Sequence, residues 1–453
     1  MKITKFVNRV KEIQLLNNKW KTNNAQFIVI YGRRRIGKTE IIKQFIKDKK
    51  GIYFLGRLES KKDQLERISN HLSEFFSDSV LNTSPLNSWE AVFQYISNKK
   101  DKFIFAVDEF PYVVKTSPEI LSVIQDYWDN KLNKSKIFFI FCGSSLSMME
   151  KYIFDYSTPI YGRRTLDIKV PSLSFIDLQD FFPKNNLEEN VKIYSILGGT
   201  PAYQLEYEKN IYYTIKKLTS KQSFLLREPE FILREEVTEP RLFISILQAI
   251  STGKTSVGEI TNHAGLDKGI VGKYLSVLID LDMVRREVPV TDSWKSRKGK
   301  YYIKDNFFNF WFRFIYPNLH HVEINPIIVE NIIKKEMNGY IGQIFEDICK
   351  QFLITKRVCS HSKIGRWWHK DKEIDIVGLN DNKEIVFFEC KWKNLDYNQS
   401  LKILEELKTK SQYVKWHNSK RKERFGLFAK KFEKKNELRK QGYLIYDLDD
   451  WKT

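Results

Sequence analysis

At 453 residues the chain is too long for a single hydrophobic core, so we expect about two to four domains. Hydrophobic and charged contents of 42% and 29% are those of a globular protein, and no apolar run approaches the roughly 20 residues that span a bilayer. The net charge of +20 favours polyanionic partners, of which nucleic acid is the commonest.

The first strong signal is a strand that leads into a glycine-rich loop. Phe27–Tyr31 is a continuous β-branched and aromatic run, the pattern of a buried parallel strand. The motif G-x-x-x-x-G-K-[ST] follows, and apolar residues at helical spacing come next. This order predicts a P-loop that binds a nucleoside triphosphate, ATP or GTP, with Mg²⁺. The loop consists of Gly32, Arg33, Arg34, Arg35, Ile36, Gly37, Lys38 and Thr39.

The residue types in this loop suit phosphate chemistry. Gly32 and Gly37 permit backbone conformations that turn amide groups toward phosphates, and the following helix adds its dipole. We expect Lys38 to reach the β- and γ-phosphates and the Thr39 hydroxyl to hold Mg²⁺.

Two later strands carry polar residues at their ends. Lys102–Phe110 ends in Asp108, predicted to reach the Mg²⁺ shell, and Glu109, predicted to orient or deprotonate the attacking water. Ile137–Ser145 ends in serines, of which Ser144 could sense the γ-phosphate. An ordinary strand-to-loop transition is the alternative for Ser144.

Taken together, these motifs resemble a known family. Phe6-x-Asn8-Arg9-x-x-Glu12, the P-loop, VDEF, CGSS, PIYGRRT and GGTPAY occur in the order found in archaeal-type ATPases of the STAND branch of AAA+ proteins. The resemblance covers roughly residues 1–240. It implies ATP as the nucleotide, ATP hydrolysis, a P-loop core over residues 1–170 and a helical lid over residues 171–240.

The resemblance also assigns residues before the P-loop. Arg9 and Glu12 match the motif that lies near the base and ribose. Asn8 stands where the family usually has glycine, which puts that local contact in doubt.

Further matches lie after the sensor strand. Arg163 and Arg164 match arginines that could stabilise transition-state charge, within the chain or toward a second copy, or could bind nucleic acid. A homo-oligomer is therefore one open arrangement beside a monomer. Gly199 and Pro201 match the turn in the lid that contacts nucleotide; from spacing alone they mark only a helix break.

Residues 241–303 show the pattern of a winged helix, with three helical segments followed by a hairpin around the basic insert Asp292–Lys300. One interpretation is DNA contact; the other is a lid or protein-interaction module. The aromatic run Asn306–Asn318 completes a predicted domain over residues 241–330, and we expect it to form a packing core rather than a base-stacking surface. The candidate DNA contacts are Lys268, Lys273, Lys295, Arg297 and Lys298.

The chain then begins a further α/β domain, predicted over residues 331–453. A helix carries Glu346, one strand carries Asp375, and the next strand carries Glu389 and Lys391. Positions two apart on a strand share a face, so Glu389 and Lys391 point the same way and Asp375 can join them. Carboxylates beside a lysine can hold Mg²⁺ and activate water next to a phosphodiester.

This arrangement resembles the PD-(D/E)XK nuclease superfamily, with a restriction-endonuclease-like fold. The segment GRWWHKDKEIDIVG…FFECKW is similar to a domain of unknown function that follows the ATPase in the family above. Residues 391–440 hold 16 Lys and Arg against 6 Asp and Glu, which favours a nucleic-acid partner over a merely solvated face. Non-cleaving nucleic-acid binding and protein binding remain alternatives.

The favoured hypothesis is therefore a cytoplasmic, ATP-hydrolysing, DNA-associated protein with a nuclease-like effector domain. The alternative is a STAND-type signalling switch whose C-terminal domain binds a partner without cleaving nucleic acid. No CxxC pair indicates a zinc site, and three of the four cysteines, Cys142, Cys349, Cys359 and Cys390, lie in or beside apolar stretches and are expected to be buried.

Overall fold

The computed structural model describes residues 6–358, 361–418 and 420–451, so Cys359 lies outside the described residues. The chain forms two compact units. The first ends at Ser172 and also contains Glu235–Thr238; the second comprises Leu173–Arg234 and the chain from Glu239 onward. In the described part of the chain, no helix combines the length and apolarity needed to cross a membrane.

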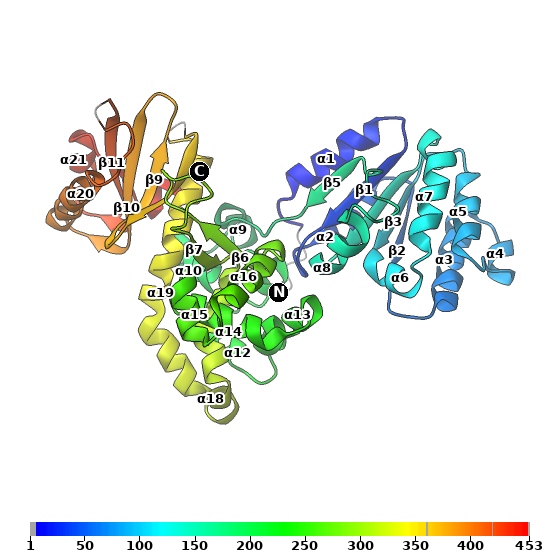
Figure 1. Ribbon diagram of the computed structural model, residues 1–453, viewed down its shortest axis with the longest axis horizontal. Helices are drawn as coiled ribbons and strands as arrows, with labels where there is room; N and C mark the ends of the chain where they lie inside the picture. Colours follow the sequence, from blue (N-terminus) through cyan, green and yellow to red (C-terminus); the bar gives the residue numbers. More distant parts are fainter. Residues whose placement is uncertain (1–5, 359–360, 419, 452–453) are drawn as a thin grey trace. The chain divides into compact units, whose positions relative to one another are not determined.

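The first unit is built on a five-stranded parallel sheet (Figure 1). The three strands predicted from apolar runs are almost wholly buried and lie side by side as β3, β4 and β1. Their carboxyl ends therefore meet at one edge of the sheet, where ligands bind in open α/β folds. In spatial order the strands are β2 (Gly51–Leu55), β3 (Ile104–Asp108), β4 (Phe138–Gly143), β1 (Gln26–Tyr31) and β5 (Leu166–Lys169).

Alternate residues of these strands enter two separate apolar cores, one on each face of the sheet. Phe27 and Phe139 belong to one core, and Ile28 and Ile140 belong to the other, as a period of two requires. The helices of this unit are α1 (Val10–Lys21), α2 (Lys38–Ile46), α3 (Lys61–Phe76), α4 (Val80–Thr83), α5 (Trp89–Ser97), α6 (Phe110–Thr116), α7 (Ile120–Asn130) and α8 (Leu146–Met149).

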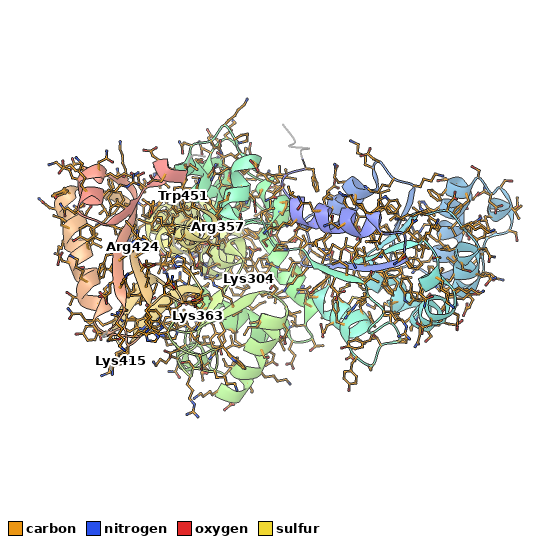
Figure 2. The ribbon with its side chains drawn as sticks, turned by 90° about the horizontal axis from the view of Figure 1, so that it is seen from above. Lys304, Arg357, Lys363, Lys415, Arg424 and Trp451 are labelled. Carbon is orange, nitrogen blue, oxygen red and sulfur yellow. The ribbon has the colours of Figure 1, made fainter. Side chains whose placement is uncertain are left out.

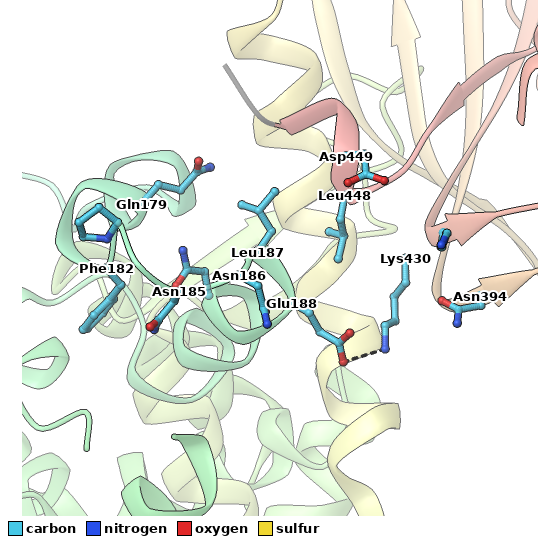
Figure 3. Close-up of a pocket in the computed structure, with 13 residues that line it drawn as sticks. Gln179, Phe182, Asn185, Asn186, Leu187, Glu188, Asn394, Lys430, Leu448 and Asp449 are labelled. Atoms are coloured by element: carbon cyan, nitrogen blue, oxygen red, sulfur yellow. Dashed lines mark hydrogen bonds and ion pairs between the residues drawn. The ribbon is translucent and has the colours of Figure 1, made fainter. Parts of the chain in front are cut away.

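The second unit starts with short helices where the lid was predicted, and these are α9 (Phe175–Phe181), α10 (Leu187–Leu197), α11 (Pro201–Gln204), α12 (Ile211–Leu218) and α13 (Glu228–Glu236). Helix α10 contacts the C-terminal sheet through an ion pair of 2.8 Å between Glu188 and Lys430, beside an open groove of about 670 Å³ (Figure 3). None of the predicted site residues lines this groove.

Three helices and a hairpin follow, as the winged-helix pattern predicted. Ser256 and Glu259 form a capping box at the start of the second helix, and Gly265 ends it with a φ of 64°. The elements are α14 (Pro240–Ser251), α15 (Val257–Ala264), α16 (Lys268–Asp280) and the antiparallel strands β6 (Val284–Glu287) and β7 (Lys300–Ile303).

The aromatic run is a packing core, which confirms that interpretation. It begins with α17 (Asn306–Phe310), its rings are buried, and the Trp311 indole donates a hydrogen bond of 2.8 Å to the Leu226 carbonyl. After α18 (Leu319–Ile324), helix α19 (Pro326–Thr355) runs unbroken across position 330, where a boundary was expected. Asn325 caps α19 and Pro326 opens it, so the helix starts there and continues through Gly339 and Gly342.

The C-terminal domain is a five-stranded mixed sheet (Figure 1). Strands β8, β9 and β10 pair antiparallel, whereas β11 and β12 continue the sheet parallel to β10. Helices α19 and α20 both pack on β10, the strand that carries Glu389. The elements are β8 (Lys363–His369), β9 (Lys372–Leu379), β10 (Glu384–Leu395), α20 (Tyr397–Ser411), β11 (Lys422–Phe432), α21 (Lys435–Lys440) and β12 (Leu444–Tyr446).

Candidate functional site

The glycine-rich loop between β1 and α2 has the backbone that its sequence predicts. Gly32 has a φ of +148°, and a Cβ there would lie 2.6 Å from Ile36 Cδ1 and 2.7 Å from the Val170 carbonyl. Gly37 has a φ of +92° and begins α2. Glycine is thus required at Gly32 by both conformation and space, and at Gly37 by conformation.

Lys38 is held over the loop. Its side chain is buried, and its Nζ donates hydrogen bonds of 2.8 Å to the carbonyls of Gly32 and Arg33. Burial lowers the pKa of this ammonium, while the nearby carboxylates of Asp108 and Glu109 oppose that shift. The Lys38 ammonium group therefore lies against the P-loop backbone, where the phosphates of a bound nucleotide would place negative charge next to it.

Oxygen atoms suited to Mg²⁺ meet beside the loop. The Thr39 hydroxyl donates to Asp108 Oδ2 at 2.6 Å, and the Tyr53 hydroxyl donates to the same oxygen at 2.8 Å. Burial and the Asp108 charge both raise the pKa of Tyr53, so its proton stays in this bond. Hydroxyl and carboxylate oxygens are hard donors, so this set fits the magnesium role predicted for Thr39 and Asp108. Tyr53, on the neighbouring strand β2, was not predicted.

Glu109 lies at the end of β3 with a φ of 52°, a left-handed conformation that non-glycine residues adopt at some energetic cost. Its carboxylate accepts hydrogen bonds from the Ser144 hydroxyl at 2.5 Å and from the Ser144 amide at 3.3 Å. The predicted water-activating carboxylate of Glu109 and the predicted sensor Ser144 are therefore hydrogen-bonded directly to each other.

Two acidic residues that were not predicted lie at the same edge of the sheet. Glu235 forms an ion pair of 3.0 Å with Arg34 of the loop, and Tyr112 accepts a 2.6 Å hydrogen bond from Arg34. Glu236 accepts hydrogen bonds from the amides of Leu146 and Ser147 and from the hydroxyls of two serines, at 2.8–3.2 Å. Their distance from the motifs along the chain left no sequence signal for this role.

Arg9 contacts the backbone of the P-loop and of the segment that follows β5. It is 6% exposed and donates to the carbonyls of Pro171 and Ile36, both at 2.7 Å, and to Glu12 at 3.3 Å. Asn8 has a φ of 58°, which explains how asparagine can stand at a position where glycine is usual. The structure thus gives Arg9 a scaffolding contact, and its predicted contact with base or ribose stays a prediction.

Arg163 and Arg164 do not lie at the phosphate edge. They precede β5, whose residue Leu166 pairs with Ile28, whereas the loop lies beyond Tyr31 at the other end of β1. At about 3.3 Å per residue this places their backbone roughly 20 Å from Gly32, while the Arg164 guanidinium extends to the Phe154 ring at 4.6 Å, which packs on Tyr31. Arg163 pairs with Asp129 at 2.6 Å and Arg164 donates to the Ile153 carbonyl. Their predicted roles, in stabilising transition-state charge within the chain or toward a second copy, or in binding nucleic acid, stay predictions.

Gly199 and Pro201 belong to the second unit. The Gly199 carbonyl accepts a 2.8 Å hydrogen bond from the Leu173 amide, and a Cβ at Gly199 would collide with the Leu173 carbonyl. Pro201 opens α11. Their role as nucleotide contacts stays a prediction.

The C-terminal domain brings three of its predicted residues together. Lys391 Nζ lies 2.6 Å from Glu389 Oε2 and 3.6 Å from Asp375 Oδ2, and the Cys390 amide donates to Asp375 at 2.8 Å. Lys410 of α20, which was not predicted, occupies the other Glu389 oxygen at 2.7 Å. Burial opposes ionisation of Glu389, but the two lysines prevail and hold its pKa below the ordinary value.

Glu346 is engaged by a different cation. The Arg366 guanidinium donates to Glu346 Oε2 at 2.8–3.0 Å and also reaches Glu287 at 3.3 Å and Asp347 at 3.6 Å. Burial and the Asp375 charge raise the pKa of Glu346. Glu287 belongs to β6, so one arginine joins the winged helix to the candidate carboxylates. The cavity beside them, about 260 Å³, is lined by residues including Arg285, Lys300, Tyr302, Glu346, Asp347 and Arg366.

Over the described ranges, no three acidic, histidine or cysteine side chains stand in a geometry ready to hold a metal ion. Lys391, Lys410 and Arg366 each lie against a carboxylate that was predicted as a ligand. The metal role of Glu346, Asp375 and Glu389 therefore stays a prediction.

Comparison with known protein families and sequences gives a consistent picture. Residues 6–207 match an ATPase domain found predominantly in Archaea, residues 244–286 match bacterial regulatory proteins of the arsR family, and residues 311–403 match archaeal and bacterial proteins of unknown function. The uncharacterized protein MJECL04 of Methanocaldococcus jannaschii is 38% identical over 98% of this chain and 100% of its own length. The uncharacterized ATP-binding protein MJ0423 of the same organism is 52% identical over 11% of this chain and 81% of its own.

Among solved structures, the Walker-type ATPase PABY2304 of Pyrococcus abyssi covers 68% of this chain and 96% of its own, with a TM-score of 0.53 and 19% identity. At that identity the likeness shows the fold, which is that of a P-loop NTPase with additional domains.

Proposed function

Since the chain belongs to the same family as its full-length relative MJECL04 and contains an ATPase domain of a type found predominantly in Archaea, we propose that it couples ATP hydrolysis to work on DNA. The ATPase domain spans residues 6–207, and the chain is an ATPase. The DNA role and the effector role of the C-terminal domain are the proposal. It rests chiefly on the convergence of Asp375, Glu389 and Lys391 in a chain that also carries a helix-turn-helix.

At the nucleotide site each residue has a separate task. The amides of the loop and Lys38 bind the phosphates of ATP. Thr39 and Asp108 would hold Mg²⁺, which would supply charge neutralisation to the bound phosphates. Glu109 orients or deprotonates water, and Ser144 positions Glu109 through the 2.5 Å hydrogen bond between them.

The winged helix supplies the DNA contact. Lys268 and Lys273 lie exposed on α16, which follows the turn in a helix-turn-helix and would enter the major groove. Their positive charge suits phosphates, in keeping with the net charge of +20.

The C-terminal domain acts as a metal-dependent nuclease of the PD-(D/E)XK type. Asp375 and Glu389, with Glu346, are the candidate Mg²⁺ ligands, and Lys391 would position or deprotonate the nucleophile. For a metal to bind, Lys391, Lys410 and Arg366 must first give up their carboxylates. DNA phosphates are the natural new partners for these cations.

The test is nicking of supercoiled plasmid by the full chain with Mg²⁺ or Mn²⁺, with and without ATP. Asp375→Ala and Lys391→Ala should reduce nicking to background, whereas Asp371→Ala, an exposed carboxylate in the preceding turn with a side chain 76% exposed, should not. Equal nicking by wild type and Asp375→Ala would assign the activity to a contaminant and remove the proposal.

A STAND-type switch is the second candidate, and a specific observation favours it. Both oxygens of Glu389 are neutralised by lysines and Glu346 is paired with Arg366, so the cluster is self-consistent without a metal. In that case the C-terminal domain binds a partner and cleaves nothing. Measurable ATP turnover with no nicking by folded wild type under any nucleotide condition would select the switch.

A further inference from the structure

The tip of the wing presents an exposed tryptophan. Trp294 is 75% exposed, whereas the nine other tryptophans, all within the described ranges, are buried or half-buried. A large aromatic ring held in water costs free energy that burial against a partner would recover. The exposed Trp294 ring, in the loop between β6 and β7, therefore indicates a surface that a binding partner would cover.

The loop that carries Trp294 is braced from inside. Arg286 donates to the carbonyls of Trp294, at 2.7 Å, and Ser296. A Cβ at Gly299 would lie 2.5 Å from the Arg286 Nε, so the glycine leaves room for this guanidinium. The Ser296 hydroxyl also donates to Asp292 at 2.8 Å. The backbone is therefore fixed while the ring points outward.

A second anchor comes from the C-terminal domain. Lys363, labelled in Figure 2, donates from its Nζ to the carbonyls of Val290 and Asp292 at 2.9 and 2.8 Å. A ring on a preorganised loop loses little conformational freedom on binding, so most of its contact energy appears as affinity.

The side chains around the ring are mainly basic. Lys295 Nζ lies 5.4 Å from the ring centroid, and Arg297 and Lys298 are exposed beside it. The acidic residue of the tip, Asp292, is paired with Lys298 at 3.3 Å. The combination of an aromatic face and cations matches a partner that offers both stacked rings and anionic groups.

We propose that the wing tip, residues 292–298, is a DNA-contacting wedge in which Trp294 stacks on a base while Lys295 and Arg297 hold the adjacent phosphates. The inference rests on the DNA-binding function proposed above and specifies its substrate as DNA with an open or easily opened base step. Helix α16 of the same domain supports this assignment, because Lys268 and Lys273 are exposed on it and Gly272 leaves its surface flat for close approach.

The experiment measures the affinity of the full chain for a labelled duplex with a central bulge, and for the same duplex without it, across a series of salt concentrations. Trp294→Ala should weaken binding to the bulged duplex by about 5- to 150-fold, by a similar factor at every salt concentration, because stacking releases no counterions. Trp294→Phe should retain most of the affinity. Arg297→Ala should instead lower the salt slope by about 0.9.

Tyr156→Ala is the matched control, since Tyr156 is another exposed ring, 83% exposed, in the first unit. It should bind DNA as wild type does. All variants should keep the wild-type ATPase rate and thermal midpoint, since none alters a buried group.

The outcomes separate the two proposals. If wild type binds DNA and Trp294→Ala binds equally well, the wedge is refuted and the DNA role stands. If wild type binds neither duplex, the DNA role fails and the wedge fails with it. Loss of binding to phosphatidylserine vesicles in Trp294→Ala, with DNA affinity unchanged, would assign the tip to a lipid surface and overturn the inference.

Discussion

The replacement of Arg366 by methionine tests whether the charged cluster between the winged helix and α19 stabilises the second unit. Arg366 is 6% exposed and contacts the carboxylates of Glu346, Glu287 and Asp347. Methionine keeps the length and apolar stem of the side chain but removes the charge and all donors. The three carboxylates then depend on the cations that remain.

The magnitude follows from which carboxylates keep a partner. Arg285 and Lys350 still neutralise Glu287 and Asp347, whereas Glu346 loses the cation that faces it. Breaking a fully buried ion pair costs about 3–5 kcal/mol, but Glu346 can take up a proton and its side chain is 22% exposed. We therefore expect a loss of about 2–3 kcal/mol, or roughly 4–8 °C in the unfolding midpoint.

The assay is thermal unfolding of the full chain, with hydrogen exchange of peptides from α19 and β8 to locate the change. Lys304→Met is the control (Figure 2). Lys304 also forms a direct ion pair, with 2.7 Å between its Nζ and Asp282, but its side chain is 47% exposed. It should cost less than about 1 kcal/mol. Combining Arg366→Met with Glu346→Gln should recover part of the loss, since the unpaired carboxylate is gone. An Arg366→Met variant that unfolds and exchanges like wild type would refute the reasoning.

The pH dependence has a defined sign. Burial alone would raise the pKa of Asp347, but the surrounding cations Arg285, Arg366 and Lys350 hold it well below its ordinary value, and that of Glu287 is also lowered. Stability from carboxylates with a lowered pKa is present above their unfolded value of about 4 and is lost as the pH falls below it. Arg366→Met removes one of the cations that lower these two pKa values, so the difference between wild type and the variant should be present at neutral pH and shrink as the pH falls below about 4. A difference that grows on acidification would contradict this account.

Three further predictions concern the two sites. Lys38→Ala should weaken ATP binding about 10- to 100-fold in a fluorescent-nucleotide titration, because it removes a charged donor to phosphate; unchanged affinity would remove that role. Glu109→Gln should lower kcat for ATP by about 10²–10⁴ and change nucleotide affinity little, and a kcat near wild type would show that another group activates water. Lys410→Ala should tighten Mn²⁺ binding in calorimetry, because one of the two ammonium groups on Glu389 is gone; weaker binding would mean that Lys410 supports the site in some other way.

The features predicted best from the sequence are those that a short stretch of the chain determines by itself. The loop at Gly32–Thr39 needs two glycines, a lysine and a hydroxyl at fixed spacing after a buried strand, and each requirement is visible in the chain. The same holds for the Glu389 and Lys391 pair, because two positions on one strand share a face whatever the rest of the fold does.

Arg163 and Arg164 show what such reasoning leaves open. Arg163 and Arg164 follow the sensor strand in the expected order, but order along the chain does not say at which end of a parallel sheet a connecting loop lies. They precede β5, and strands that run parallel place their first residues at the edge opposite the phosphate loop. Tyr53 escaped prediction for the complementary reason: nothing in its neighbourhood marks it, and it meets Asp108 only because β2 pairs with β3.

Glu346 and Arg366 show the same limit for the chemistry of a site. The helix-then-strands order predicts Glu346 to be a carboxylate near Asp375; burial first, and the Asp375 charge second, raise the pKa of Glu346. Whether the Glu346 carboxylate is free to bind a metal ion depends on Arg366, which lies 20 residues later in the chain, on β8. Arg366 also donates to Glu287 of the winged helix. Residue types therefore tell which groups could serve a metal site, whereas only the contacts between domains tell what those groups are bonded to.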